Sequence, residues 1–393
     1  MADSMLSVII GAMLAALVLP GSAYLLLLSL TGWRKAVLPA GQRPAEGRIA
    51  IIVPAHDEAE GIGRTVDNLL AIARQDGQAE VCVIADNCSD ATAKVARAHG
   101  ARVLERFNPG LRGKGYALDF AFQTLAEEGF LAYVVIDADT LAEANLLQVL
   151  RGHFGQGALA VQSRYTVLNA DQSPRTRLSE LALCAFNCLR PRGRHALGCS
   201  AGIFGNGFAL HRSVLERVPY TATSVVEDLE YHLRLIDAGI RVHFADETIV
   251  RGDMPVAAAG QKTQRARWEG GRIRMLLDHG PDLLRRVLGG QWRFCEPLLD
   301  LLLLPLAYHS VLLLALVVLP WQPARIIGLA GLAILALHVL IAARVGGISF
   351  GRLLATLPSV PQYVFWKLAM LRATTRAAKA STHWVRTQRD RHS

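Results

Sequence analysis

The chain has 393 residues, enough for two or three domains, and 52% of them are apolar whereas only 19% are charged. This composition excludes a disordered or fibrous chain and favours a membrane protein. The net charge of +9 is concentrated at the C-terminal end, where nine basic residues and one acid follow residue 343. We therefore expect contact with anionic lipid, and no nucleic-acid partner. Six cysteines without a C-x-x-C pair predict reduced thiols.

The N-terminal segment is uncharged from Ser4 to Gly32, longer than the roughly 20 residues that cross a bilayer. The only charged residue before it is the acidic Asp3, whereas a cleaved signal peptide would begin with basic residues. The sequence therefore predicts an uncleaved transmembrane anchor over residues 1–32. Arg34 and Lys35 follow it directly, which places the next segment in the cytoplasm and the N-terminus outside.

Residues 48–285 alternate short β-rich runs with helical runs, which predicts an α/β domain with parallel strands. The expected strands are 49–53, ending at Pro54, then 81–84, 103–104 and 133–136; the expected helices are 62–73, 90–99 and 115–127. Ligands of such sheets bind outside the carboxyl ends of the strands. Polar residues cluster at three of these ends, at 54–58, 86–90 and 137–139.

Asp137 and Asp139 follow the last of these strands at a spacing of two, so both carboxylates can reach one cation. Mg²⁺ or Mn²⁺ takes one or two carboxylates together with phosphate oxygens, which predicts a nucleoside diphosphate ligand. Taken alone, the pair is better explained as two solvated surface acids, but its position after an apolar strand of an α/β domain favours a metal site.

Two further positions suit a nucleotide. Asp86 can accept the N3–H of uracil, whereas Asp90, at the start of a helix, is explained by capping. Lys114 lies in the turn 112–115, Arg-Gly-Lys-Gly, where glycines let backbone amides and a lysine approach phosphate. A solvated capping turn is the alternative for Lys114.

Glu227 and Asp228 begin a predicted helix over 226–238, where capping by acids is the plain alternative to a catalytic role. Gln264, Arg267 and Trp268 share one helix face. The ring can stack on a sugar and the guanidinium can neutralise a departing diphosphate. An amphipathic helix lying under the membrane explains the same face.

The C-terminal part contains two uncharged runs, 301–324 and 326–343, joined by a short turn at 320–323. We interpret residues 298–345 as a transmembrane hairpin, with Pro305 tolerated inside its first helix. The apolar segment 353–366 is too short for a typical membrane span and contains Pro358 and Pro361. We therefore interpret 353–393 as an interfacial helix, anchored by Tyr363, Trp366 and Lys367, with a basic cytoplasmic tail; a tilted fourth span is the alternative.

The combination of motifs resembles the membrane-integrated family 2 glycosyltransferases, which include cellulose, hyaluronan and chitin synthases and ceramide glucosyltransferases. The resemblance covers about residues 48–270 and rests on these motifs: 53–58 (VPAHDE), 85–90 (ADNCSD), 113–114 (GK), 137–139 (DAD), 205–207 (GNG), 227–228 (ED) and 264–268 (QRARW). It departs from the usual pattern at Ala85, which replaces an acid, and at Val226, which replaces a threonine or serine.

The resemblance implies a GT-A fold, a UDP-sugar donor, and Mg²⁺ or Mn²⁺ held at Asp139 with Asp137. It implies that Asp228 is the catalytic base beside Glu227. The donor site it implies comprises Pro54, Ala55, Glu58, Asp86, Lys114, Asp137 and Asp139. The acceptor and leaving-group side it implies comprises Gly207, Gln264, Arg267 and Trp268.

The resulting hypothesis is a multi-pass protein of the inner (plasma) membrane, with its catalytic domain in the cytoplasm. It would be an inverting glycosyltransferase that moves a sugar to a lipid-linked glycan or glycolipid, possible also as a homo-oligomer. The same-class alternative is a processive synthase that extrudes its own polymer. The alternative from another class is a transporter with a nucleotide-sensing domain. Because the expected spans contain no Asp, Glu, Lys or Arg between their ends, they do not favour transport.

Overall fold

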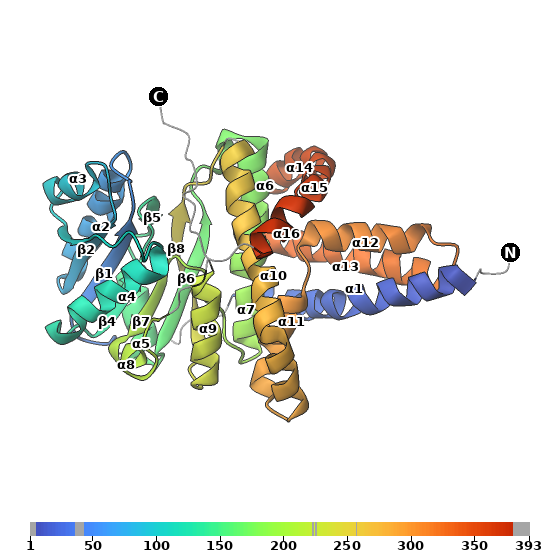
Figure 1. Ribbon diagram of the computed structural model, residues 1–393, viewed down its shortest axis with the longest axis horizontal. Coiled ribbons are helices and arrows are strands. Elements are labelled where there is room, and N and C mark those ends of the chain that lie inside the picture. The colour runs from blue at the N-terminus through green and yellow to red at the C-terminus, as the bar shows by residue number, and fades with distance from the viewer. Residues whose placement is uncertain (1–4, 36–42, 222–223, 225, 257, 380–393) are drawn as a thin grey trace. The chain divides into compact units, whose positions relative to one another are not determined.

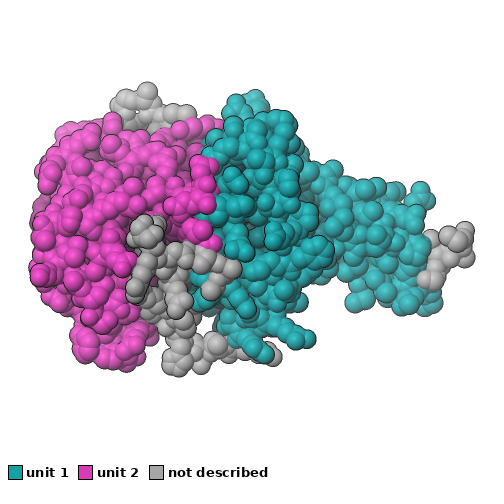
Figure 2. Space-filling view, turned by 90° about the horizontal axis from the view of Figure 1, so that it is seen from above, with its two compact units in different colours: residues 1–34, 173–197, 257–381 teal, residues 35–172, 198–256, 382–393 magenta. Residues whose placement is uncertain are grey.

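The computed structural model describes residues 5–35, 43–221, 224, 226–256 and 258–379. The chain forms two compact units, coloured separately in Figure 2. Of the described residues, the sheet unit contains those within 35–172 and 198–256. The helical unit contains residues 1–34, 173–197 and 257–381.

An eight-stranded sheet forms the centre of the sheet unit, with strand order β3-β2-β1-β4-β7-β6-β8-β5. The strands are β1 (Ile49–Ala55), β2 (Ala79–Asp86), β3 (Arg102–Arg106), β4 (Ala132–Val135), β5 (Thr140–Ala142), β6 (Ala160–Val167), β7 (Phe208–His211) and β8 (Val242–Gly252). Strands β3, β2, β1 and β4 are parallel, whereas β7 is antiparallel to both of its neighbours. The expectation of a parallel sheet therefore holds for β3, β2, β1 and β4 and for the pair of β6 with β8, but not for β7 or for β5, which is antiparallel to β8.

The helices of this unit are α2 (Ile62–Asp76), α3 (Thr92–Ala98), α4 (Lys114–Leu125), α5 (Leu146–Gly155), α8 (Arg212–Arg217) and α9 (Glu227–Asp237), with short 3-10 turns at Ala126–Glu128 and Ala170–Gln172. They cover both faces of the sheet (Figure 1). Along β1, Ile51 belongs to the core that includes Val66 of α2, whereas Ile52 belongs to the core that includes Leu118 of α4. Burial on both faces explains the uninterrupted apolar run of β1.

The strands and helices expected between residues 49 and 136 are confirmed, apart from their exact ends. The prediction that β1 stops at Pro54 was wrong, because pairing with β2 continues to Ala55. Pairing with β4 ends at Ile52, whose carbonyl accepts from the Ile136 N–H. Pro54, two residues further, faces the same side beyond that pairing, so its missing N–H breaks no ladder bond.

The helical unit is built from α1 (Met5–Gly32), α6 (Pro174–Leu183), a π-helical segment (Cys184–Leu189), α7 (Arg190–Ala196), α10 (Ala258–Leu288), α11 (Cys295–Leu302), α12 (Leu306–Val318), α13 (Gln322–Gly346), α14 (Phe350–Thr356), α15 (Val360–Ala369) and α16 (Leu371–Lys379), with 3-10 turns at Trp292–Phe294 and Leu357–Ser359. In the described part of the chain, α1 and α13 are each long and apolar enough to cross a membrane. The segment 292–318 is a third candidate if its two bent halves are counted together.

Part of the expected domain 48–285 packs within the helical unit, namely residues 173–197 and 258–285. The bounds of the catalytic domain stay a prediction. A Cβ on Gly193 would lie 2.7 Å from the Leu28 carbonyl oxygen, and one on Gly32 would lie 2.6 Å from that of Leu189. Backbone contact this close between α1 and the α7 region explains why these helices join the apolar ones.

The expected span 301–324 is broken, because Leu303 is extended before Pro305 and the two halves differ in direction by 77°. The proline ring disfavours the helical region for the residue before it, Leu304, so a helix that ends at Leu302 is favoured over one that continues through Pro305. Lys367 was expected at the lipid headgroups, but its side chain is 2% exposed and forms an ion pair with Glu269 of α10. The end of the predicted basic tail, 380–393, lies outside the described residues.

Candidate active site

The loops after β1 and β2 hold each other in place at the carboxyl edge of the sheet. His56 Nδ1 lies 2.7 Å from the Asp86 carbonyl oxygen, and Asp57 accepts from the N–H groups of Ser89 (2.6 Å) and Asp90 (3.2 Å). Burial opposes ionisation of Asp57, but the hydrogen bonds from Ser89 outweigh it and lower the pKa of this carboxyl. Asp57 and Asn87 both have positive φ angles, of 54° and 50°. Such backbone conformations in two loops that contact each other indicate that this edge of the sheet is conformationally constrained, as is typical of binding sites.

Asp86, the predicted uracil contact, is 5% exposed and lies at the end of β2. Its Oδ1 accepts from Arg106 at 2.6 Å and from the Asn87 amide at 2.9 Å. Sequence reasoning missed Arg106, because only two residues of β3 were expected and the strand extends to this arginine. Because Oδ1 already accepts two hydrogen bonds, we expect the uracil N3–H to donate to Oδ2 of Asp86.

The centre of the site brings together four positions from distant parts of the chain. Lys114, the first residue of α4, donates to Asp137 after β4 and to the carbonyl oxygen of Gly205. A Cβ built on Gly205 would lie 3.2 Å from Asp228 Oδ2 and 3.7 Å from Lys114 Nζ. The lysine, the first acid of the D-x-D triplet and the predicted base at the start of α9 therefore meet around one glycine.

The charges of this cluster act on one another. Burial disfavours the charged amine of Lys114, but Asp137, Glu227 and Asp228 outweigh it and raise the pKa of the lysine. Burial raises the pKa of Asp228, and a hydrogen bond from its own helix, at Leu229, together with Lys114 opposes that rise. A carboxyl with a raised pKa is better matched to accepting a proton near neutral pH than an ordinary aspartate.

We expect Lys114→Met to move the acid limb of the pH profile of kcat upward. The positive charge of Lys114 lowers the pKa of Asp228, so without it the carboxylate would protonate at higher pH. Lys114→Arg retains the charge and serves as the control. The measurement is kcat between pH 4 and pH 9 for the three proteins, and superimposable acid limbs would contradict the coupling.

The loop before β7 is shaped by two glycines, Gly205 (φ 74°) and Gly207 (φ 70°). Asn206 between them is 1% exposed, accepts from the Asp137 N–H at 3.1 Å and donates to Thr140 Oγ1 at 2.8 Å. The Asn206 side chain thereby ties this loop to both ends of the D-x-D segment. The motif 205–207 is visible in the sequence, but the role of Asn206 depends on contacts with residues about 70 positions earlier, which the sequence does not show.

Close packing adds to the positive φ in requiring glycine at position 207, because a Cβ there would lie 2.4 Å from Ser163 Oγ and 2.5 Å from Val250 Cγ2. Its expected place on the acceptor side stays a prediction. We expect Gly207→Ala to destabilise the protein by at least 2–3 kcal/mol more than Gly77→Ala. Gly77 has a similar φ of 76° and no neighbouring atom within 4 Å, so it measures the backbone cost alone. Denaturant unfolding of both variants checks this, and equal losses would contradict the steric explanation.

The residues proposed to hold a metal are carboxylates at the end of β4. Asp137 contacts Lys114, and Asp139 accepts from Thr140 Oγ1 at 3.2 Å. Hard oxygen donors of this kind fit Mg²⁺ or Mn²⁺. A second group with metal-ligand spacing contains Asp57, Cys88 and Asp90. Because Asp57 is already bonded to the 89–90 loop, we assign that group to loop structure.

The remaining predicted residues lie in both units. Pro54 and Ala55 end β1, and Glu58 follows, its N–H donating to Thr92 Oγ1 at 2.8 Å. Gln264, Arg267 and Trp268 lie on α10 of the helical unit, all partly exposed. Their contribution to the site of the sheet unit stays a prediction.

The model of the family described as "Glycosyltransferase like family 2" matches residues 44–271. A probable glycosyltransferase YdaM of Bacillus subtilis is 26% identical over 58% of this chain and 56% of its own. A beta-monoglucosyldiacylglycerol synthase of Trichormus variabilis is 27% identical over 68% of this chain and 58% of its own. The chain thus spans little more than half the length of these curated relatives.

A solved structure with a similar fold is the mannosyltransferase PcManGT from Pyrobaculum calidifontis, in complex with GDP-Man and Mn²⁺. It is 19% identical, with a TM-score of 0.53, and the match covers 94% of this chain and 97% of that one. Since the family model matches more than half of the chain, the protein belongs to the glycosyltransferase-like family 2, and its sheet unit has the GT-A fold.

Proposed function

We propose that the protein transfers a hexose from a UDP-sugar to a lipid acceptor in the membrane, with inversion at the anomeric carbon. The observation that carries this proposal is the convergence of Asp228, Lys114 and Asp137 around Gly205. A glucosyl donor and a diacylglycerol acceptor are the first choices, because a relative carries the name beta-monoglucosyldiacylglycerol synthase. Two helices long enough to cross a membrane support a lipid acceptor.

In the proposed reaction the acceptor hydroxyl oxygen attacks the anomeric carbon. The bond from that carbon to the diphosphate oxygen breaks, and its electron pair leaves with UDP. Asp228 accepts the hydroxyl proton, which its raised pKa favours. Lys114 carries positive charge next to the same carboxylates and can pair with the diphosphate in place of Asp137.

A divalent cation fits the carboxylates of Asp139 and Asp137, and when bound it would neutralise charge on the leaving diphosphate. The chemistry of the donor set supports this, since both side chains are oxygen ligands two residues apart. On α10, we propose that Arg267 assists the same leaving group and that Gln264 and Trp268 bind the acceptor sugar or headgroup.

Processive synthesis with extrusion is the second candidate of the same class. A polar polymer needs a path walled off from about 30 Å of hydrocarbon. Two or three candidate spans are too few to enclose such a path within one chain, which favours the addition of one or few sugars. Long polymer protected inside sealed vesicles, made from donor supplied on the catalytic face, would contradict this.

The donor is tested by a hydrolysis screen. The full-length protein, purified in a non-ionic detergent, is incubated with Mn²⁺ and a panel of UDP- and GDP-hexoses, and released nucleotide is measured. We expect UDP-sugars to be hydrolysed at least about tenfold faster than GDP-sugars. Faster hydrolysis of GDP-mannose would overturn the assignment of Asp86 as a uracil contact.

A further inference from the structure

Arg190, the first residue of α7, is buried without a polar partner. It is 5% exposed, and its Nε atom is fully shielded and makes no hydrogen bond. In the described part of the chain, its guanidinium contacts the ring of Phe186 at 5.2 Å and forms no ion pair. The two terminal nitrogens carry the paired N–H donors of the guanidinium, and they are the atoms that would meet an anion.

The acids near Arg190 are already engaged by other arginines. Asp300 pairs with Arg194 and, at 2.9 Å, with Arg272. Glu296 lies 2.6 Å from Arg194 Nε. The two carboxylates therefore pair with Arg194 and Arg272, and no acid is left to pair with Arg190 among the described neighbours. Burial lowers the pKa of Arg190 to about 10, and Asp300 only partly opposes this effect.

A surplus buried charge is costly unless a counter-charge is supplied. The histidines near it do not supply one. The charge of Arg190 acts on the rings of His309 and His338, and His338 Nε2, which is fully buried, also lacks a hydrogen-bond partner. Ser29 donates to the Leu25 carbonyl oxygen and lies 2.8 Å from His338 Nδ1, and an imidazole in either protonation state carries no negative charge.

The depth of Arg190 in the membrane indicates which anion is available, and this depth follows from the part of α1 that α7 contacts. The 28 residues of α1 rise about 42 Å, whereas the hydrocarbon core of a bilayer is about 30 Å thick. Residues from about Tyr24 onward therefore lie at headgroup level when the N-terminal part spans the core. This end of α1 contacts the α7 region, through Tyr24 with Arg194 and Leu28 with Gly193.

We propose that Arg190 binds the phosphate of a membrane lipid at headgroup level. A guanidinium offers two parallel N–H donors that match two phosphate oxygens, and the phosphate supplies the missing negative charge. The phosphate can come from a resident anionic phospholipid or from a phosphorylated lipid substrate. Arg190 is not among the residues proposed for sugar transfer, and the test of this site needs no activity.

The test measures lipid binding by the full-length protein in non-ionic detergent, using native mass spectrometry and thermal unfolding. The probes are phosphatidylglycerol, a polyprenyl phosphate, diacylglycerol and inorganic phosphate. We expect Arg190→Gln to weaken binding of phosphate-bearing lipid by at least about tenfold and to leave diacylglycerol binding unchanged. Tighter binding of phosphatidylglycerol identifies a resident lipid, and tighter binding of polyprenyl phosphate identifies a substrate.

Arg293→Gln is the matched control, because Arg293 also lies over a phenylalanine ring, at 4.9 Å from that of Phe294, but is exposed. Without lipid, Arg190→Gln should unfold at the same temperature as the parent or higher, since it removes an uncompensated charge. With phosphatidylglycerol only the parent and the control should gain stability. Equal lipid affinity in Arg190→Gln, an equal loss of stability with and without lipid, or saturation by inorganic phosphate alone would overturn the proposal. If Arg190→Gln does not fold, Arg190→Lys gives the same comparison with intermediate affinity expected.

Discussion

Asp228→Asn should reduce sugar transfer by about 10² to 10⁴-fold while UDP affinity stays near that of the parent. Asparagine keeps the shape of the side chain at the start of α9 but cannot take the acceptor proton. The acid limb of kcat that belongs to this carboxyl should also disappear, because burial has raised the pKa of Asp228 and the carboxylate is the active form. The measurements are kcat across pH and UDP binding by calorimetry.

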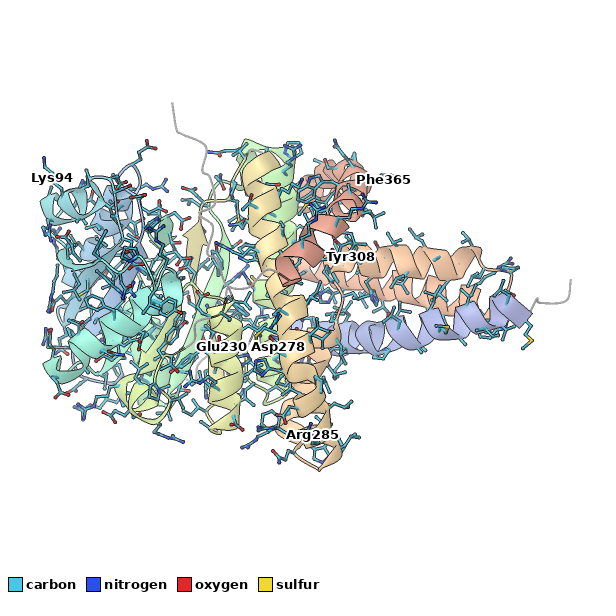
Figure 3. All side chains as sticks on the ribbon, viewed as in Figure 1. Lys94, Glu230, Asp278, Arg285, Tyr308 and Phe365 are labelled. Carbon is cyan, nitrogen blue, oxygen red and sulfur yellow. The ribbon has the colours of Figure 1, made fainter. Side chains whose placement is uncertain are left out.

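Glu230→Gln is the control for that variant, because Glu230 lies in the same first turn of α9 (Figure 3) and accepts from the Ser224 N–H at 3.1 Å. It should retain activity within a few-fold of the parent. An Asp228→Asn protein that loses UDP binding in proportion to its activity would show that the residue is structural.

Asp139→Asn should abolish the part of UDP affinity that depends on Mn²⁺. Replacing a carboxylate by an amide removes the charge that a hard cation requires, whereas Asp137 is already in contact with Lys114. UDP binding is measured with Mn²⁺ and with EDTA, and the variant should give the same weak affinity in both.

The control for Asp139→Asn is Glu143→Gln, a nearby acid whose partner is Arg251 at 2.8 Å. It should keep the full response to Mn²⁺. An Asp139→Asn protein that still binds UDP as tightly as the parent in Mn²⁺ would remove Asp139 from the metal site.

The strand ends of the sheet unit could be predicted because their signal is local. Apolar runs of four or five residues followed by acids gave β1, β2 and β4 and the positions of Asp86, Asp137 and Asp139. The meeting of Asp228 with Lys114 could not be predicted from spacing. It depends on the left-handed backbone of Gly205, which lies 91 residues beyond Lys114.

The division into units could not be predicted either, because an amphipathic helix has the same pattern whichever unit it packs on. Residues 173–197 interrupt the sheet unit between β6 and β7. Their place in the helical unit depends on the close approach of Gly193 to Leu28, which no periodicity encodes. The buried arginines of α7 were likewise invisible, since the sequence shows their charges but not the acids that face them.

The most direct test of sugar transfer to a lipid is to supply the full-length protein, in vesicles containing diacylglycerol, with isotopically labelled UDP-glucose and Mn²⁺. Extracted lipids are then analysed by mass spectrometry. We predict a lipid carrying a single hexose in the β configuration, formed by the parent and by Glu230→Gln but about 10² to 10⁴-fold more slowly by Asp228→Asn. Label found only in free glucose or in a long water-soluble polymer, across a panel of UDP-sugars and lipid acceptors, would contradict this function.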